Sequence, residues 1–409
     1  MARRAKVKPQ PFRAAPLRKV LLLVDTSRSY GRGLVRGVAR YNEEHGRWSV
    51  YFKPHALDAP PPPWLDEAQA DGILARISDQ RTVQAVQACG VPTVDLRGIV
   101  PGLPFPFVGV DHVAVAQLAA EHLLERGFRH FGFCGLPRGI HPHMDHLCDT
   151  FVATVQAKGY PCSEFVGRTG PRRGESWERQ QNRQAQWADQ QERLVRWISR
   201  LDKPAAVMAC HDDRALQVLD ACRRVGVMVP EEVAVISVDN DPYLCDLAIP
   251  PLTSIDDNPR QIGYEAARLL DRLMNGEPIP DCPTLILPLG VVTRRSTDVL
   301  AIKNRNITHT LRLIHEHACD GIFARDVAAR IPLSRVQLAE QFKRAVGRTI
   351  GQEIQRIRIQ RVKELLEQTD LAIKQIARRS GYRSVEYMTR AFRHLTGQTP
   401  GKYRKERHK

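Results

Sequence analysis

From residue 20 to about residue 290, short apolar runs alternate with segments in which apolar residues recur at helical spacing. Val20–Val24 is fully apolar, as expected of a strand buried on both faces, and Gly33–Glu44 then has the period of an amphipathic helix. The other strands predicted in this way are Trp48–Phe52, Gly72–Ile77, Val91–Leu96, Phe107–Val110, His130–Cys134, Pro204–Ala209 and Val233–Val238. The other predicted helices are Val113–Arg126, Asp149–Lys158, Ala215–Val225 and Gln261–Asn275. The alternation predicts an α/β fold of parallel sheets wrapped by helices, and its length suits two lobes.

The pattern changes after Thr297, where nearly all apolar residues fall at helical spacing. A long amphipathic stretch, Ile350–Leu366, lies in the middle of this segment. The chain is therefore expected to have three parts: a basic, proline-containing flexible arm over residues 1–18, a two-lobed α/β domain over 19–298, and an all-α domain over 299–409.

The helical segment contains an internal repeat at an offset of fifty residues. Ser334, Leu338, Phe342, Gly347 and Thr349 correspond to Ser384, Met388, Phe392, Gly397 and Thr399. Each serine is a suitable helix N-cap, the two large apolar residues lie on one face, and each glycine is placed to end its helix.

A short helix precedes each of these capped helices. Arg325–Arg330 leads to a turn around Pro332, and Ile373–Arg379 leads to a turn at Gly381. A helix, a tight turn and a capped second helix form a helix-turn-helix unit, whose second helix enters the DNA major groove. The long helix between the units is a rigid spacer that could place the two recognition helices near one DNA turn apart. The alternative for this segment is a plain helical bundle.

Charge is distributed unevenly along the 409 residues, whose formal net charge is +16. Residues 301–409 carry +14, residues 1–19 carry +7, and residues 20–300 carry −5. A basic helical domain attached to a mildly acidic body favours a nucleic-acid partner over a merely solvated basic surface. Nine scattered cysteines without a C-x-x-C pair, no long apolar run and no signal-peptide core predict a cytoplasmic protein without membrane partners.

The last hundred residues resemble the DNA-binding domain of the AraC family. The resemblance rests on Ile376-Ala377, Ser380-Gly381-Tyr382, Arg390-Ala391-Phe392-Arg393, Thr399-Pro400 and Tyr403-Arg404. The middle of the chain resembles LacI-type sensors and periplasmic sugar-binding proteins at Val108–Asp111, Ala209–Asp212, Val229–Val233, Ile236–Asp239 and Pro250–Ile255. A sensor of this type fused to this kind of C-terminal domain is similar to the xylose-operon regulator (XylR) family. This resemblance implies a ligand-responsive transcription factor that acts as a homodimer.

Residues on the exposed faces of the two recognition helices are the candidates for DNA contact. Arginine can read guanine and glutamine can read adenine with two hydrogen bonds, whereas other cationic side chains hold phosphates. The candidates are Ser334, Arg335, Gln337, Ala339, Glu340, Lys343, Ser384, Val385, Glu386, Thr389, Arg390, Arg393, Lys402 and Arg404. For each one the alternative is an exposed helix residue without a base contact.

The sensor ligand is expected between the lobes, beyond the carboxyl ends of the parallel strands. Asp239 follows a buried strand and is the leading candidate, although an aspartate there could simply cap a turn. By resemblance, Asp257 lies in the third crossing between the lobes. Asp212 is expected to cap the next helix. The full set of ligand candidates is Asp25, Ser27, Arg28, Tyr30, Asp111, His146, His211, Asp239 and Asp257.

One position departs from the related sugar sensors, which place a ligand-clamping arginine four residues before the aromatic at Phe151. This chain has Leu147 there, so His143, Asp145 or His146 could take over the role, or the sugar could differ. The stretch His141–Cys148 also contains suitable metal ligands, but spacing alone does not make a metal site, and none is predicted.

The leading interpretation is a transcription regulator that binds an operator under the control of a sugar such as xylose. Sensing of another sugar or a polyol is the first alternative. An enzyme is disfavoured because the chain has no G-x-S-x-G, no P-loop and no dinucleotide-binding glycine motif, and no cofactor is expected. A solute-binding transport protein is disfavoured by the basic C-terminal domain. RNA polymerase becomes a partner if the protein is an activator.

Overall fold

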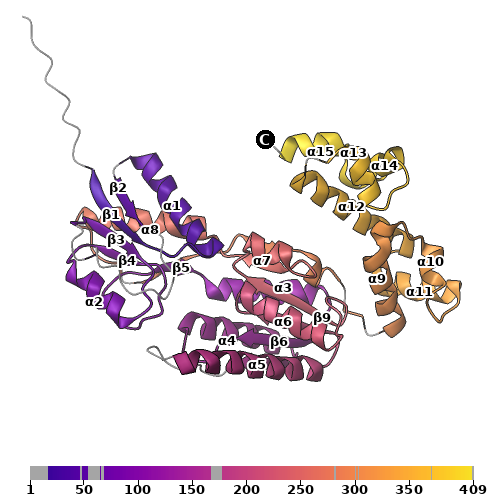
Figure 1. Cartoon of the computed structure of the whole chain (residues 1–409), viewed down its shortest axis with the longest axis horizontal. Helices are drawn as coiled ribbons and strands as arrows, with labels where there is room; N and C mark the ends of the chain where they lie inside the picture. Colours follow the sequence, from indigo (N-terminus) through magenta and orange to yellow (C-terminus); the bar gives the residue numbers. More distant parts are fainter. Residues whose placement is uncertain are drawn as a thin grey trace, which may run out of the picture.

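The computed structural model describes residues 17–46, 48–53, 65, 69–166, 177–280, 282–299, 301–302, 304–369 and 371–407. Two α/β lobes lie side by side, and a helical domain extends from the second lobe (Figure 1). Most of the expected arm lies outside the described residues. Its last residue, Arg18, begins strand β1 and donates a 2.6 Å hydrogen bond to Asn275, so the prediction that the arm extends to residue 18 is wrong.

The N-terminal lobe is built on a parallel sheet of order β2-β1-β3-β4. Helices α1 and α8 pack so closely that a Cβ on Gly263 would lie 2.1 Å from the carbonyl oxygen of Leu34. Only glycine allows this approach of two helix backbones. The elements are β1 (Arg18–Leu23), α1 (Ser29–His45), β2 (Trp48–Phe52), β3 (Gly72–Ala75), α2 (Gln80–Ala88), β4 (Thr93–Asp95), β5 (Val108–Val110), α8 (Pro259–Met274) and β11 (Thr284–Ile286).

The C-terminal lobe has a six-stranded sheet of order β12-β10-β9-β8-β6-β7, parallel except for β12. Central strand β9 is buried along all six residues, as its unbroken apolar run predicts. The elements are α3 (His112–Glu125), β6 (His130–Gly135), α4 (Pro142–Ala157), β7 (Cys162–Val166), α5 (Trp177–Arg200), β8 (Ala205–Ala209), α6 (Asp212–Arg224), β9 (Val233–Val238), α7 (Pro242–Leu247), β10 (Thr253–Asp256), β12 (Gly290–Val292) and the 3-10 turn η2 (Arg295–Thr297).

The chain crosses between the lobes three times. The crossings follow β5, β10 and β11 in sequence order, because β5, α8 and β11 pack in the N-terminal lobe while α3, β10 and β12 pack in the C-terminal lobe. Asp257 lies in the second crossing, between β10 and α8. Its expected place in the third crossing is therefore wrong, although it does lie between the lobes.

The C-terminal domain contains the two predicted helix-turn-helix units, joined by α12. Ser334 and Ser384 cap α11 and α14 through bonds to the backbone N–H of Gln337 and Tyr387, and Gly347 and Gly397 end these helices in the left-handed conformation. The repeat is thus confirmed as a structural repeat. The elements are α9 (Arg305–His317), η3 (Ala318–Asp320), α10 (Ala324–Ala328), α11 (Arg335–Val346), α12 (Ile350–Gln368), α13 (Ile373–Arg379), α14 (Val385–Thr396) and α15 (Pro400–Arg407).

The predicted helix over 149–158 begins too late. In the structure α4 starts at Pro142, where a proline in the first turn costs no hydrogen bond. Its first turns mix Met144 and Leu147 with the polar residues His143, Asp145 and His146, and this mixture hid the helical spacing. Among the described residues, no helix has both the length and the apolar character needed to cross a membrane.

Candidate functional site

The carboxyl ends of parallel strands from both lobes face a shared cleft, and polar residues follow these strands directly. Asp25 follows β1 and Arg76 follows β3 in the N-terminal lobe, while His211 and Asp239 follow β8 and β9 in the C-terminal lobe. A cavity of about 450 Å³ opens beside Asp239 and is lined by both lobes, including Arg32, Asn240 and Asp256. The expected location of a ligand site at the strand ends therefore has a physical basis in the structure.

A buried pair joins Asp25 and Arg76 on the N-terminal side of the cleft. The Arg76 guanidinium lies 2.5 Å from an Asp25 carboxylate oxygen, and the Ser27 hydroxyl donates to the other oxygen at 3.2 Å. The same guanidinium lies 5.1 Å from the centre of the Tyr30 ring. Burial, and next the nearby Asp257, raise the pKa of Tyr30, so its hydroxyl stays protonated and can donate a hydrogen bond.

Asp239 and Asp257 form the acidic side of the cleft. Asp257 is 3% exposed, and its Oδ1 atom has no hydrogen-bond partner among the described residues. Burial raises the pKa of Asp257 to about 7, and Asp256 contributes to the increase. Burial, followed by the charge of Asp257, raises the pKa of Asp239 well above its ordinary value. A hydroxyl donor from a ligand would relieve the cost of the buried, unpaired Asp257 oxygen.

A group of histidines lies near the start of α4. His143 stacks on Phe107 and His112, with ring centroids 5.1 and 5.3 Å apart. His141 lies within the field of Arg97, and its buried Nδ1 atom has no hydrogen-bond partner among the described residues. Burial, and next the charge of Arg97, lower the pKa of His141 to about 3, so the ring is neutral at physiological pH and can accept as well as donate.

Of the residues that the sequence suggested for the role of the absent arginine, His143 has a buried Nε2 atom without a hydrogen-bond partner among the described residues. Leu147 is fully buried, His146 is exposed, and Asp145 accepts a 2.8 Å hydrogen bond from the backbone N–H of Gly139. Across the residues that the structure describes, no group of three or more histidine, cysteine, aspartate or glutamate side chains could hold a metal ion.

Several predicted ligand residues have structural partners. Asp111 caps α3 through the backbone N–H groups of residues 113 and 114, and the His211 Nδ1 atom caps α6 at 3.2 Å from the N atom of Arg214. Arg28 forms a 2.9 Å ion pair with Asp213 across the two lobes. Asp212 lies within the first turn of α6 and accepts hydrogen bonds from the hydroxyls of Ser237 and Ser254. A structural role for Asp212 was expected. Instead of capping α6, its carboxylate joins the start of this helix to strands β9 and β10 through Ser237 and Ser254.

Sequence reasoning missed Arg76, Asp95, Arg97 and His141. Asp95 is 1% exposed and accepts hydrogen bonds from the backbone N–H groups of Ile77, Arg97 and Gly98, which shapes the loop after β4. Arg97 directly follows the predicted strand Val91–Leu96, so a search of strand ends for charged residues would have found it. Arg76 was placed inside the predicted strand Gly72–Ile77, but the observed strand β3 ends one residue before it.

The pKa of Asp257 leads to a pH dependence of stability. Between the ordinary aspartate pKa near 4 and about 7, the folded protein holds a proton that the unfolded chain has lost, so stability falls as the pH rises. The wild-type protein should lose on the order of 2–4 kcal/mol of its free energy of unfolding between pH 5 and pH 8. The Asp257→Asn variant has no carboxyl group to titrate at this position, so we expect this loss to be absent from it. Denaturant unfolding of both proteins at pH 5 and pH 8 measures the free energy of unfolding. Asp246→Asn, at an exposed carboxylate, is the control and should keep the wild-type pH dependence.

The recognition helices present most DNA candidates to solvent. Arg335, Glu340 and Lys343 are exposed on α11, and Glu386 and Arg390 are exposed on α14. The remaining exposed candidates are Ser334, Gln337, Ala339, Ser384, Arg393 and Lys402. Val385, Thr389 and Arg404 are half-buried.

Several of these candidates also hold the domain together. Gln337 and Ser334 form a reciprocal capping box, and Val385 packs against the core of the second unit. The Arg404 guanidinium donates a 2.7 Å hydrogen bond to the carbonyl of Leu371. A phosphate contact by Arg404 would compete with this bond, whereas Arg335 and Arg390 make no such contact among the described residues.

A buried junction fixes the two units relative to each other. Arg358 on α12 is 4% exposed and donates to the carbonyls of Ala318 and Ile322 in the first unit. Gly381 of the second unit packs on the same turn, where a Cβ atom would lie 2.6 Å from the Ala318 carbonyl oxygen. Nineteen residues at about 1.5 Å give α12 a length of about 28 Å, close to the spacing of adjacent major grooves.

Comparisons with known proteins identify both parts of the chain. A periplasmic binding protein-like domain matches residues 120–297, and a helix-turn-helix domain matches residues 327–406. The xylose operon regulatory protein of Haemophilus influenzae is 30% identical over 94% of this chain and 98% of its own length. The corresponding protein of Escherichia coli K12 is 29% identical over 94% of this chain and 96% of its own length.

Solved structures of transcription regulators are also similar to this chain. The structure of a xylose-binding transcription activator superposes with a TM-score of 0.79 at 28% identity, covering 96% of this chain and 98% of its own. A LacI family regulator from Mycobacterium smegmatis shares the fold over 68% of this chain and 98% of its own, with a TM-score of 0.53 at 22% identity. The named relatives are regulators and not enzymes, in agreement with the expectation from sequence.

Proposed function

The chain belongs to the family of xylose operon regulatory proteins, and from this membership we propose that a small sugar, xylose or another pentose, controls its binding to an operator. The combination of domains makes it a DNA-binding transcription regulator with a sensor of the sugar-binding type. The proposal concerns the identity of the effector, the residues that hold it and the residues that read DNA.

One observation carries the effector proposal. Asp257 has a buried oxygen without a hydrogen-bond partner among the described residues, and the charge of Asp257 raises the pKa of nearby Asp239. In the same cleft, Arg76 lies over the Tyr30 ring. Carboxylates that accept from hydroxyl groups, together with an aromatic wall, suit a neutral polyhydroxylated ligand. Ser27 and Tyr30 would then complete the site, and His141 or His143 would take the place of the absent arginine.

The test is a binding titration on the full chain with D-xylose, D-ribose, L-arabinose, D-glucose and xylitol. We expect at least one pentose to bind and to change the affinity for an operator fragment selected from random DNA. A polyol or hexose that binds in place of the pentoses would support the alternative, in which the substitution at Leu147 has changed the specificity. If no compound binds or alters DNA affinity, the sensor proposal is wrong.

We further propose that the protein is a cytoplasmic homodimer, because two copies would place four recognition helices on one operator. Sedimentation of the full chain tests the oligomeric state. RNA polymerase is a partner only if the regulator is an activator, which transcription from a selected operator in vitro would establish.

Arg335 and Arg390 should contribute to sequence reading. Each is exposed on a recognition helix, where a bidentate contact to guanine is worth about 1–3 kcal/mol. We expect Arg335→Ala or Arg390→Ala to lower operator affinity about 5-fold to 150-fold and to relax the preference at one base pair. Lys343→Ala is the comparison, since loss of a phosphate contact should weaken binding to all sequences alike. Loss of affinity without any change in base preference would contradict base reading by these arginines.

A further inference from the structure

A buried cluster of ionisable side chains joins the DNA-binding domain to the C-terminal lobe of the sensor. His315 of α9 lies between Glu231 of the sensor and Glu353 of α12, and these three side chains are 2–4% exposed. The His315 Nδ1 atom is 3.5 Å from Glu231, and its Nε2 atom is 3.8 Å from Glu353. Buried ionisable groups are costly unless they are paired, so this arrangement constrains how the two domains meet.

Further ion pairs extend this cluster to the linker between the domains. Glu353 pairs with Arg348 and, at 2.8 Å, with Arg356. Arg356 also lies 2.8 Å from Asp298, which immediately follows η2 at the end of the sensor. Burial alone would raise the pKa of Glu353, but the hydrogen bonds from Arg356 and the charges of Arg356 and Arg348 hold it at about 2, so this carboxylate remains charged.

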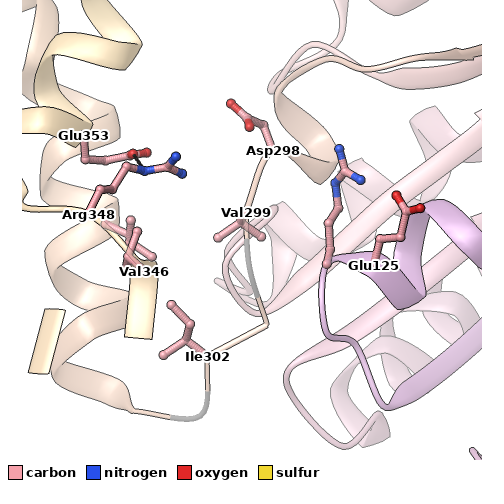
Figure 2. A pocket seen from close by; sticks show the side chains of 9 residues that line it. Glu125, Asp298, Val299, Ile302, Val346, Arg348 and Glu353 are labelled. Atoms are coloured by element: carbon pink, nitrogen blue, oxygen red, sulfur yellow. Dashed lines mark ion pairs between the residues drawn. The ribbon is translucent and has the colours of Figure 1, made fainter. Parts of the chain in front are cut away.

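The interface beside this cluster is not packed solid. A cavity of about 290 Å³ lies between Glu125 and Arg126 at the end of α3, Val299 and Ile302 of the linker, and Val346 of α11. Figure 2 shows these side chains around an open space, with the ion pair between Arg348 and Glu353 on its far side from Glu125. Because apolar side chains do not fill this space, the ion pairs of the cluster fix much of the orientation of the DNA-binding domain relative to the sensor.

One strand connects the cluster to the effector cleft. Glu231 lies two residues before β9, and Asp239 follows the last residue of the same strand. β9 is buried throughout, is paired on both sides with β8 and β10, and spans about 20 Å. The Ser296 hydroxyl of η2 also donates to the Val235 carbonyl at 2.6 Å, which joins the linker to the middle of the strand. A shift of the strand at one end is therefore transmitted to the other as a rigid displacement.

We propose that Glu231, His315 and Glu353 form a regulatory latch, which ties the orientation of the DNA-binding domain to the position of β9 and so to occupancy of the cleft at Asp239. The proposal rests on the proposed function for its effector, but the latch itself is a property of the ligand-free chain. Because the junction around Arg358 fixes the two helix-turn-helix units to each other, a change at the latch moves both units together.

The test compares Glu231→Gln with Glu316→Gln in the full-length protein. Glu316 is a glutamate on α9 itself whose ion pair with Arg312 of the same helix is exposed, so it is a matched control. Hydrogen exchange of the α9 amides in the ligand-free protein measures the latch. Operator affinity with and without D-xylose measures the coupling, and calorimetry measures sugar binding separately.

For Glu231→Gln we expect exchange in α9 to accelerate at least tenfold, sugar affinity to change less than twofold, and the effect of sugar on operator affinity to fall at least threefold. Glu316→Gln should match the wild type in all three. Wild-type exchange in Glu231→Gln, or an unchanged effect of sugar on DNA binding, would overturn the proposal. His315→Gln provides the second variant if the first is poorly folded, with the same expected results.

Two failures are distinguishable in this experiment. If D-xylose does not bind to the wild type, the proposed effector is wrong, and the exchange data still decide whether the latch holds the domain. If the sugar binds normally but α9 exchange is insensitive to both variants, the latch is wrong and the proposed function stands.

Discussion

Asp239→Asn is expected to lower the affinity for the pentose effector at least a hundredfold while leaving the protein folded. A carboxylate can accept hydrogen bonds on both oxygens, whereas an amide accepts on one side and turns donors toward the ligand on the other. Two lost hydrogen bonds to a charged acceptor are worth about 3–6 kcal/mol. Asparagine tolerates the positive φ of 99° that this position requires, so the backbone need not change.

Isothermal titration of the full chain with D-xylose measures this effect. Asp220→Asn, at a carboxylate on α6 that forms surface ion pairs with Arg223 and Arg224, is the control and should bind sugar like the wild type. Operator binding by Asp239→Asn without sugar should also be unchanged. Tight sugar binding by this variant would place the ligand elsewhere and remove the central residue of the proposed site.

Phe392→Ala is expected to unfold the second helix-turn-helix unit, with a loss of about 3–5 kcal/mol in the free energy of unfolding. Phe392 is fully buried with Met388 and Ile376, and its ring lies edge-on to Tyr403 with centroids 5.4 Å apart. The cavity left by the substitution would be in a small core, which has few other contacts to compensate. Operator affinity should fall at least thirtyfold because one recognition helix is lost.

The matched control for this prediction is Leu395→Ala on the same helix, because Leu395 is 55% exposed. It should change stability by less than about 1 kcal/mol. Denaturant unfolding followed by circular dichroism measures both variants, and sugar binding shows that the sensor is intact. A Phe392→Ala protein as stable as the Leu395→Ala protein would contradict the assignment of this core.

Local patterns in the sequence predicted most of the fold. The spacing of apolar residues found strands β1, β8 and β9, because burial on both faces of a parallel sheet requires unbroken apolar runs. It found helices α1, α3, α6 and α8 but missed α2 and α5. The repeat at fifty residues found both recognition helices with their caps, since capping depends on residues only three positions apart. Arg335 and Arg390 are exposed as their helical positions predicted.

The residues that line the candidate ligand cleft were harder to predict than the fold. Asp239 was a candidate because it follows a predicted strand and Asp257 because of the family resemblance, but Arg76 and His141 were not among the ligand candidates. The substitution at Leu147 drew attention to His143, Asp145 and His146 in the first turns of α4, whereas His141, just before the helix, lies within the field of Arg97. Which side chains share a cleft depends on the order of strands in two sheets, and this order is not encoded by local periodicity.

The sequence by itself determined the α/β sensor, the tandem recognition helices and the sign of charge on each part, because these follow from local spacing and composition. Only the tertiary structure decided that Asp257 lies in the second crossing and that Glu231, His315 and Glu353 meet between the domains. The physical reason is the same for both: side chains far apart along the chain meet only once sheet order and domain packing are set, and no local pattern specifies their partners.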